Sequence, residues 1–120
     1  MVARSSTGPS EELEHFIEQF LSAVCDNSRR HILEYLSDLP GKENVPAESS
    51  VGEIADHLGL ANSTTSEHLK QLLQMNLLLA QKHGKRTFYR LRNHELVQSF
   101  HDLMYSLKSH YHRHVLPPVQ

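Results

Sequence analysis

The apolar residues that follow the N-terminus recur at the spacing of an amphipathic helix. From about Glu11 onward they are separated by steps of three and four residues: Leu13, Phe16, Ile17, Phe20, Leu21 and Val24. Such spacing places them along one face of a helix. Residues 1–10 are small and polar instead, so we expect them to form a disordered N-terminal arm.

A second, shorter helix is predicted directly after the first. Asp26 is of a residue type that caps helix N-termini. Apolar and aromatic residues continue from it to about Asp38, at Ile32, Leu33, Tyr35 and Leu36. Residues 38–50 contain two prolines and a glycine among polar side chains, which predicts a loop.

The pattern from Ser50 onward predicts two helices joined by a tight turn. Ser50, with Glu53 three residues later, forms a capping box that opens a short helix. Gly59 can end that helix because glycine adopts the left-handed conformation at little cost. A second helix is expected from about Asn62 to Asn76. Two helices with a short glycine-containing turn between them are typical of a helix-turn-helix.

A basic β-hairpin and a last helix are predicted to follow. We expect residues 77–81 and 87–91 to form two strands, of which the second alternates as strands do, with the segment KHGKR joining them. The last helix is expected from about Asn93, with one apolar face made of Leu96, Val97, Phe100, Leu103, Met104, Leu107 and Tyr111. This order predicts a mainly α fold with a small β-hairpin, a winged helix-turn-helix with flanking helices. We expect one domain over 11–114 and a flexible tail over 115–120.

Charge is distributed unevenly along the chain. Residues 1–60 contain four basic and eleven acidic side chains, whereas residues 61–120 contain eight basic and three acidic ones. Six basic residues lie within 61–92, against Glu67 alone. A basic region on a chain that is acidic overall predicts contact with a polyanion, and the alternative is an ordinary solvated charged surface.

Composition narrows the class further. No apolar stretch reaches the roughly 18 residues that a membrane span needs, and residues 1–10 lack the apolar core of a secretory signal. A single cysteine, Cys25, excludes an intramolecular disulfide. These observations favour a cytoplasmic protein with no membrane partner. No triad, paired-carboxylate or phosphate-loop pattern is present in the sequence, so we do not expect an enzyme.

Four segments resemble the ArsR/SmtB-type repressor family. AVCDNSRRHIL (23–33), VGEIADHLGL (51–60), STTSEHLK (63–70) and KHGKRTFYRL (82–91) are similar to that family's signatures, in the same order. The resemblance covers roughly 11–111. It implies a homodimeric, operator-binding transcriptional repressor that a ligand releases, with the first and last helices as the dimer interface. The two broad apolar stripes agree, because a domain of this size cannot bury both alone. The alternative is that both stripes close the monomer's own core.

Within such a fold, the candidate contacts to double-stranded DNA lie on the recognition helix and the wing. The N-terminal residues of a recognition helix approach base edges. The candidates there are Asn62, Ser63, Thr64, Thr65, Ser66 and His68, with Lys70 placed for a phosphate. Lys82, Lys85 and Arg86 suit backbone or minor-groove contact from the wing. Alternatively, the hydroxyls at 63–66 satisfy only first-turn N–H groups. Glu67 departs from the family pattern, which often has a histidine or another neutral group at this position. A carboxylate there repels DNA unless it accepts from a cytosine amine or pairs with Lys70.

The sequence indicates the inducer less clearly than it indicates the fold. At the family's thiol metal site this chain has Ser50, Val51 and Gly52, which supply no thiolate, so we do not expect arsenic, lead or cadmium sensing there. The last helix carries Glu95 and, four residues apart, His110 and His114. Glu95 of one subunit facing His110 of the other would suit zinc, nickel or cobalt. The alternative is that these histidines bind nothing.

Two other functions stay open at this point. The same fold could serve as a protein-interaction module that uses the helix bearing Glu67. It could also be a redox-responsive regulator that binds no metal, with Cys25 as the oxidised group. A buried structural cysteine is the simpler interpretation of Cys25.

Overall fold

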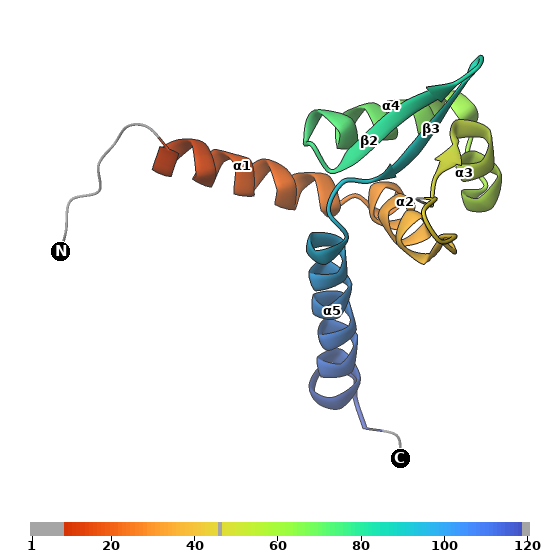
Figure 1. The fold of residues 1–120 in the computed structure, drawn as a ribbon. Coiled ribbons are helices and arrows are strands. Elements are labelled where there is room, and N and C mark those ends of the chain that lie inside the picture. The colour runs from red at the N-terminus through yellow and green to blue at the C-terminus, as the bar shows by residue number, and fades with distance from the viewer. Residues whose placement is uncertain (1–8, 46, 119–120) are drawn as a thin grey trace.

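The computed structural model of the chain describes residues 9–45 and 47–118 (Figure 1). Its helices are α1 (Pro9–Val24), α2 (Asn27–Asp38), α3 (Val51–Leu58), α4 (Asn62–Gln74) and α5 (His94–His110), which continues into a π-helical turn, η1 (Tyr111–Val115). Its strands are β1 (Ser49–Ser50), β2 (Leu78–His83) and β3 (Arg86–Leu91). The predicted fold, mainly α with a small hairpin, is confirmed.

The chain termini differ from the predicted boundaries. Because α1 begins at Pro9, the prediction that Pro9 and Ser10 belong to a disordered arm is wrong. Proline is well tolerated in the first turn of a helix, where its missing N–H would have no partner in any case. The rest of the predicted arm, 1–8, lies outside the described residues. At the other end η1 includes Val115, and 119–120 are likewise not described.

The sheet has one strand more than the sequence predicted. β1 pairs antiparallel with β3, Ser49 opposite Tyr89 and Ser50 opposite Phe88, which gives the order β1-β3-β2. The prediction that 38–50 is loop throughout is therefore wrong for its last two residues. A two-residue strand shows no alternation, and only its partner strand defines it. The hairpin is also tighter than predicted, because β2 and β3 extend to a turn at Gly84, whose φ is 67°.

Local capping interactions begin α2 and α3 and end α3, as the sequence predicted. Asp26 accepts a hydrogen bond from the backbone N–H of Arg29 at 2.9 Å. Ser50 accepts from the N–H of Glu53 at 3.3 Å, and the Glu53 carboxylate accepts in return from the N–H of Ser50 at 2.9 Å. Gly59 ends α3 in the left-handed conformation, with a φ of 69°. Each cap satisfies N–H or C=O groups that a helix end leaves without a partner.

The core lies between α2, α3, α4 and the sheet. Its buried side chains are Val24, Ile32, Leu33, Leu36, Ile54, Leu69, Leu72, Leu77, Leu78, Leu91 and Val97. Burying one Leu or Ile side chain contributes about 1.5–3 kcal/mol. Each terminal helix contributes to the core only at the end that adjoins it, through Val24 of α1 and Val97 of α5. Phe20 and Phe100 pack alongside these two residues.

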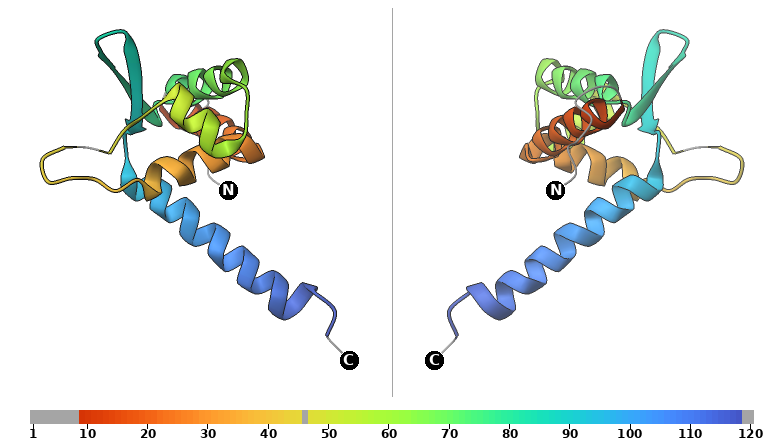
Figure 2. Two further views of the ribbon diagram at one scale, coloured as in Figure 1. Left: turned by 90° about the vertical axis from the view of Figure 1, so that its right-hand side faces the viewer. Right: turned by 90° about the vertical axis from the view of Figure 1, so that its left-hand side faces the viewer.

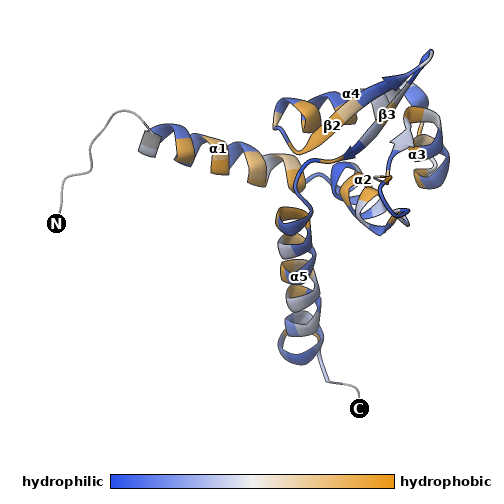
Figure 3. Cartoon of the chain, in the orientation of Figure 1, coloured by the Kyte–Doolittle hydropathy of each residue, from blue (hydrophilic) through white to orange (hydrophobic). Residues whose placement is uncertain are grey.

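The two terminal helices project from this core in different directions (Figures 1 and 2). Their apolar faces are visible along both helices in Figure 3. Leu13 is 58% exposed and Leu21 50% on α1, while Leu103 is 50% and Leu107 51% exposed on α5. The alternative that both stripes close the chain's own core is therefore wrong. Among the described residues, no helix is both long and apolar enough to cross a lipid bilayer.

Candidate nucleic-acid interface

α3, its turn and α4 form the helix-turn-helix, and α4 has one inward and one outward face. Thr65, Leu69 and Leu72 are buried against the core. The exposed side chains are those of Asn62, Ser63, Thr64, Ser66, Glu67 and Lys70. Most of the predicted recognition residues therefore share one solvent-facing surface at the start of α4.

Thr65 is an exception, and the prediction that it contacts DNA is wrong. Its side chain is fully buried, and its Oγ1 donates a hydrogen bond to the carbonyl oxygen of Ala61 at 2.9 Å. Position 65 is one helical turn before Leu69, so the helix that turns Leu69 into the core turns Thr65 inward as well.

The prediction that His68 contacts DNA is also wrong, because its side chain faces α2 and not the outward surface of α4. Its side chain is 17% exposed, and its Nδ1 lies 4.0 Å from the Asp26 carboxylate that caps α2. The backbone N–H of Arg29 holds the pKa of Asp26 below its ordinary value, and the charges of Arg29 and His68 act in the same direction. His68 thus lies against the start of α2.

The first turn of α4 presents free backbone donors at its N-terminus. The N-cap residue is Ala61, which makes no side-chain hydrogen bond to the helix. The N–H groups of that turn point along the helix axis and carry the positive end of the helix dipole. Together with the hydroxyls of Ser63, Thr64 and Ser66, they form a donor-rich surface suited to an anionic partner.

The β2–β3 hairpin forms the second part of the interface. It extends away from the core on the side opposite to α5 (Figures 1 and 2). Lys82 and Lys85 are exposed near its turn. Arg86 is partly engaged, since its Nη2 donates to Ser50 Oγ at 2.8 Å and its guanidinium lies 5.1 Å from the centre of the Phe88 ring.

Sequence reasoning missed the contacts that join this hairpin to the segment before α3. His83 Nε2 lies 2.8 Å from Glu48 Oε1, in addition to the Arg86–Ser50 hydrogen bond. Glu48 is in the predicted loop, more than thirty residues from His83, and no local pattern signals such a pair. Glu67 and Lys70 are both exposed on α4 and form no ion pair in the part of the chain that the structure describes.

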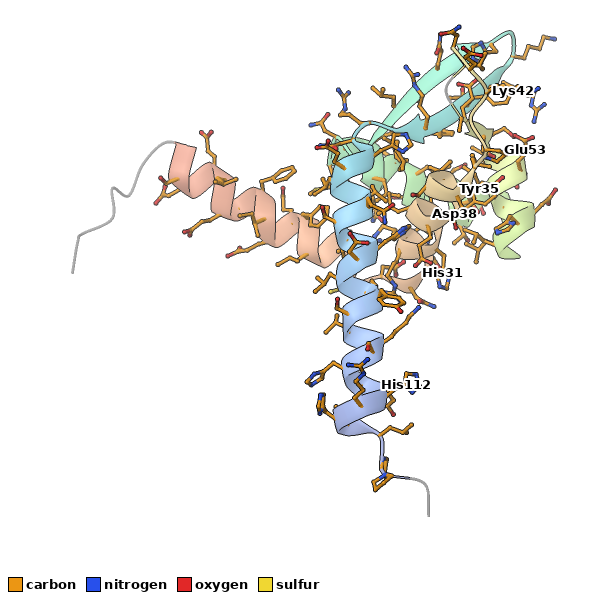
Figure 4. All side chains as sticks on the ribbon, turned by 60° about the horizontal axis from the view of Figure 1, so that its bottom comes forward. His31, Tyr35, Asp38, Lys42, Glu53 and His112 are labelled. Atoms are coloured by element: carbon orange, nitrogen blue, oxygen red, sulfur yellow. The ribbon has the colours of Figure 1, made fainter. Side chains whose placement is uncertain are left out.

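The candidate metal ligands lie at opposite ends of α5. Glu95 is in its first turn and His110 at its end, about 22 Å apart at 1.5 Å per residue. The rings of His110 and His114 are 4.9 Å apart between centres. Figure 4 marks this region with His112, far from Glu53 at the start of α3. Within the described residues, no three His, Cys, Asp or Glu side chains are grouped so that they could hold a metal ion.

Comparison with known proteins agrees with this arrangement. Residues 26–79, from the N-cap of α2 into β2, match the model of the bacterial regulatory protein, arsR family. The chain is 32% identical over 96 residues to the uncharacterized HTH-type transcriptional regulator YbzH of Bacillus subtilis (strain 168), an alignment that covers 73% of this chain and 93% of that protein.

Solved structures show the same fold. The homodimeric winged helix-turn-helix domain of Mb0332 from Mycobacterium bovis superposes with a TM-score of 0.72 at 23% identity, covering 99% of this chain and 100% of that one. Reduced HlyU from Vibrio cholerae N16961 gives a TM-score of 0.63 at 30% identity, over 82% of this chain and 94% of that one. This winged helix-turn-helix chain is a transcriptional regulator, not an enzyme, and belongs to the ArsR family of bacterial regulatory proteins.

Proposed function

We propose that the chain is a repressor that binds an inverted-repeat operator in double-stranded DNA as a homodimer. The observation that carries this proposal is that small polar side chains cover the exposed face of α4 while two exposed lysines extend from the adjacent hairpin. A duplex offers both a groove for the helix and phosphates for the lysines.

The exposed residues of α4 are assigned to the major groove. We assign Asn62 to an adenine edge, which the amide of an asparagine can pair with. Ser63, Thr64 and Ser66 are short enough to approach phosphates, base edges or thymine methyl groups. Lys70, one to two turns further along α4, meets a phosphate. On the wing, Lys82 and Lys85 contact the backbone or the minor groove.

The homodimer is supported by the unpartnered faces of α1 and α5. Soluble monomers rarely leave contiguous apolar patches of this kind exposed, and such patches are typical of protein interfaces. The solved relative from Mycobacterium bovis is homodimeric. A second copy would cover Leu103 and Leu107 and place two α4 helices about one helical turn of DNA apart, roughly 34–36 Å.

Selection of binding sites from random DNA, followed by titration, tests the proposal. The expected product is an inverted repeat bound with strong salt dependence. Removing the hydroxyls of Ser63 and Thr64 by alanine substitution should weaken that complex by about 1 kcal/mol or more per lost base contact. Ser106→Ala, an exposed hydroxyl on α5, is the matched control. Failure to select any sequence, with binding insensitive to salt, would overturn the proposal.

A substitution of Glu67 distinguishes DNA binding by the exposed face of α4 from a protein-interaction function of the same face. Beside DNA its carboxylate repels phosphates, so Glu67→Gln should tighten the complex. If α4 instead binds a protein partner, the substitution leaves the weak background DNA affinity unchanged.

We further propose that binding of a transition metal, shared between two copies of the chain, releases the operator. The support is the close pair of His110 and His114 rings, with Glu95 of the second copy as a further oxygen ligand. A two-histidine pair on one helix face suits zinc, nickel or cobalt. Metal analysis of the purified dimer, beside operator titrations with and without zinc, tests this. If the dimer contains no stoichiometric zinc and zinc does not change the operator affinity, the proposal of metal-controlled release is wrong, whereas the proposal of DNA binding is unaffected.

A further inference from the structure

Two side-chain bridges connect the wing to the residues that precede α3. The first joins His83 Nε2 on β2 to Glu48 Oε1 at 2.8 Å. The second is the hydrogen bond that Arg86 on β3 donates to Ser50 Oγ at 2.8 Å. His83 and Arg86 are directly opposite each other in the hairpin, so both bridges act at the same level.

Both bridges act beyond the point where the sheet supports the hairpin. β1 pairs with β3 only opposite Tyr89 and Phe88, and 82–87 extend past that pairing as a two-stranded ribbon. An isolated two-stranded ribbon is marginally stable in water. The direction of the ribbon therefore depends on other contacts, and the two bridges supply them.

The Phe88 ring completes this attachment. The His83 ring is 5.3 Å from it, and the Arg86 guanidinium is 5.1 Å from its centre. The Glu48 side chain is only 22% exposed, and its carboxylate lies beside His83. Ser50 Oγ, which receives the Arg86 hydrogen bond, also caps α3 by accepting from Glu53 N–H. The wing is thereby fixed to the first helix of the helix-turn-helix.

We propose that Glu48 is a positioning residue for DNA binding, which acts through His83 to hold the wing at the angle that its lysines need. This inference rests on the proposed DNA-binding function. It also assigns Arg86 chiefly to the attachment of the wing, through Ser50 and Phe88, and leaves Lys82 and Lys85 as the wing's DNA contacts.

The sign of the Glu48→Ala effect distinguishes positioning from simple electrostatics. Removing a carboxylate beside a basic hairpin should, by charge alone, tighten binding to DNA. If Glu48 positions the wing, the same substitution weakens binding by about threefold to tenfold, the loss expected for one short polar contact between side chains. Glu48→Gln keeps an oxygen acceptor for His83 and should restore most of the affinity.

The experiment is a double-substitution cycle on the selected operator, read by fluorescence anisotropy. His83→Ala should weaken binding at least as much as Glu48→Ala does, because it removes the contact with Glu48 and also the ring contact with Phe88. The double variant should be no weaker than His83→Ala, because Glu48 acts only through His83. Glu43→Ala, an exposed carboxylate on the same loop, is the matched control and should not weaken binding. Tighter binding by Glu48→Ala, or additive losses in the double variant, would overturn the inference.

A measurement without DNA keeps this inference separate from the proposed function. Amide hydrogen exchange of 82–87 should accelerate in Glu48→Ala while exchange in the buried part of α4 stays at the wild-type rate. Wild-type exchange throughout the hairpin would refute the positioning role. If the hairpin loosens as expected but the wild-type chain binds no DNA, the proposed function fails and the attachment of the wing stands.

Discussion

Lys85 offers the most direct test of the wing as a DNA-binding element. Its side chain is exposed at the turn of the hairpin, next to Gly84. No core residue depends on it, so Lys85→Ala should leave the free energy of unfolding almost unchanged. A homodimer carries two such lysines, and the substitution removes both from the complex.

The expected size of the effect follows from counterion release. Each phosphate contact contributes about 0.9 to the slope of log affinity against log salt concentration, so two lost contacts lower that slope by about 1.8. Between roughly 50 and 200 mM salt, the wild-type dimer should then lose about twelvefold more affinity than the variant. The substitution should weaken binding to operator and to unrelated DNA alike, because phosphates carry no sequence information.

Anisotropy titrations at four salt concentrations, on operator and on unrelated duplex, measure both quantities. Lys108→Ala is the control, because Lys108 lies on α5, which points away from the hairpin (Figure 1). The reasoning is refuted if Lys85→Ala retains the wild-type slope, or if Lys108→Ala lowers it equally.

Three further substitutions test the dimer, the core and a helix cap. Leu107→Glu should convert the dimer to monomers in sedimentation equilibrium, whereas Val45→Glu, equally apolar and exposed at 56%, should not. Leu69→Ala should lower the free energy of unfolding in urea by about 2–5 kcal/mol, and a smaller loss would contradict its placement in the core. The hydrogen bond from the Arg29 N–H lowers the pKa of Asp26 in the folded chain. The ionised Asp26 carboxylate therefore stabilises the fold fully at pH values above the ordinary pKa of an aspartate, and this stabilisation is lost as the pH falls through the lowered pKa. Asp26→Asn should therefore be less stable than wild type near neutral pH, with a smaller further loss on acidification; an identical pH profile would contradict this.

Much of the fold followed from interactions between near neighbours in the chain. The Asp26 cap and the Ser50–Glu53 capping box act over three residues, and the Gly59 cap acts over four. The spacing of the apolar residues predicted the helices, because residues three and four positions apart lie on the same face of a helix. The winged helix-turn-helix was therefore predictable, and the residues of α4 that face solvent were mostly identified.

Apart from the start of α1 at Pro9, the errors concern where a side chain or a short segment faces in three dimensions. Cys25, which we expected to be buried, is exposed. Thr65 belongs to the same run of small polar residues as Ser63 and Thr64, yet the packing of Leu69 turns it into the core. His68 was assigned to DNA on its position in the motif, but it packs against the cap of α2.

The amino-acid sequence by itself determined the order of helices, their caps and the basic character of the hairpin, since these depend on contacts within one or two turns of chain. Tertiary structure decided the rest: the pairing of Ser49 and Ser50 with β3 and the attachment of His83 to Glu48. These features join residues that are far apart in sequence, and their energy depends on how the packed core orients each element.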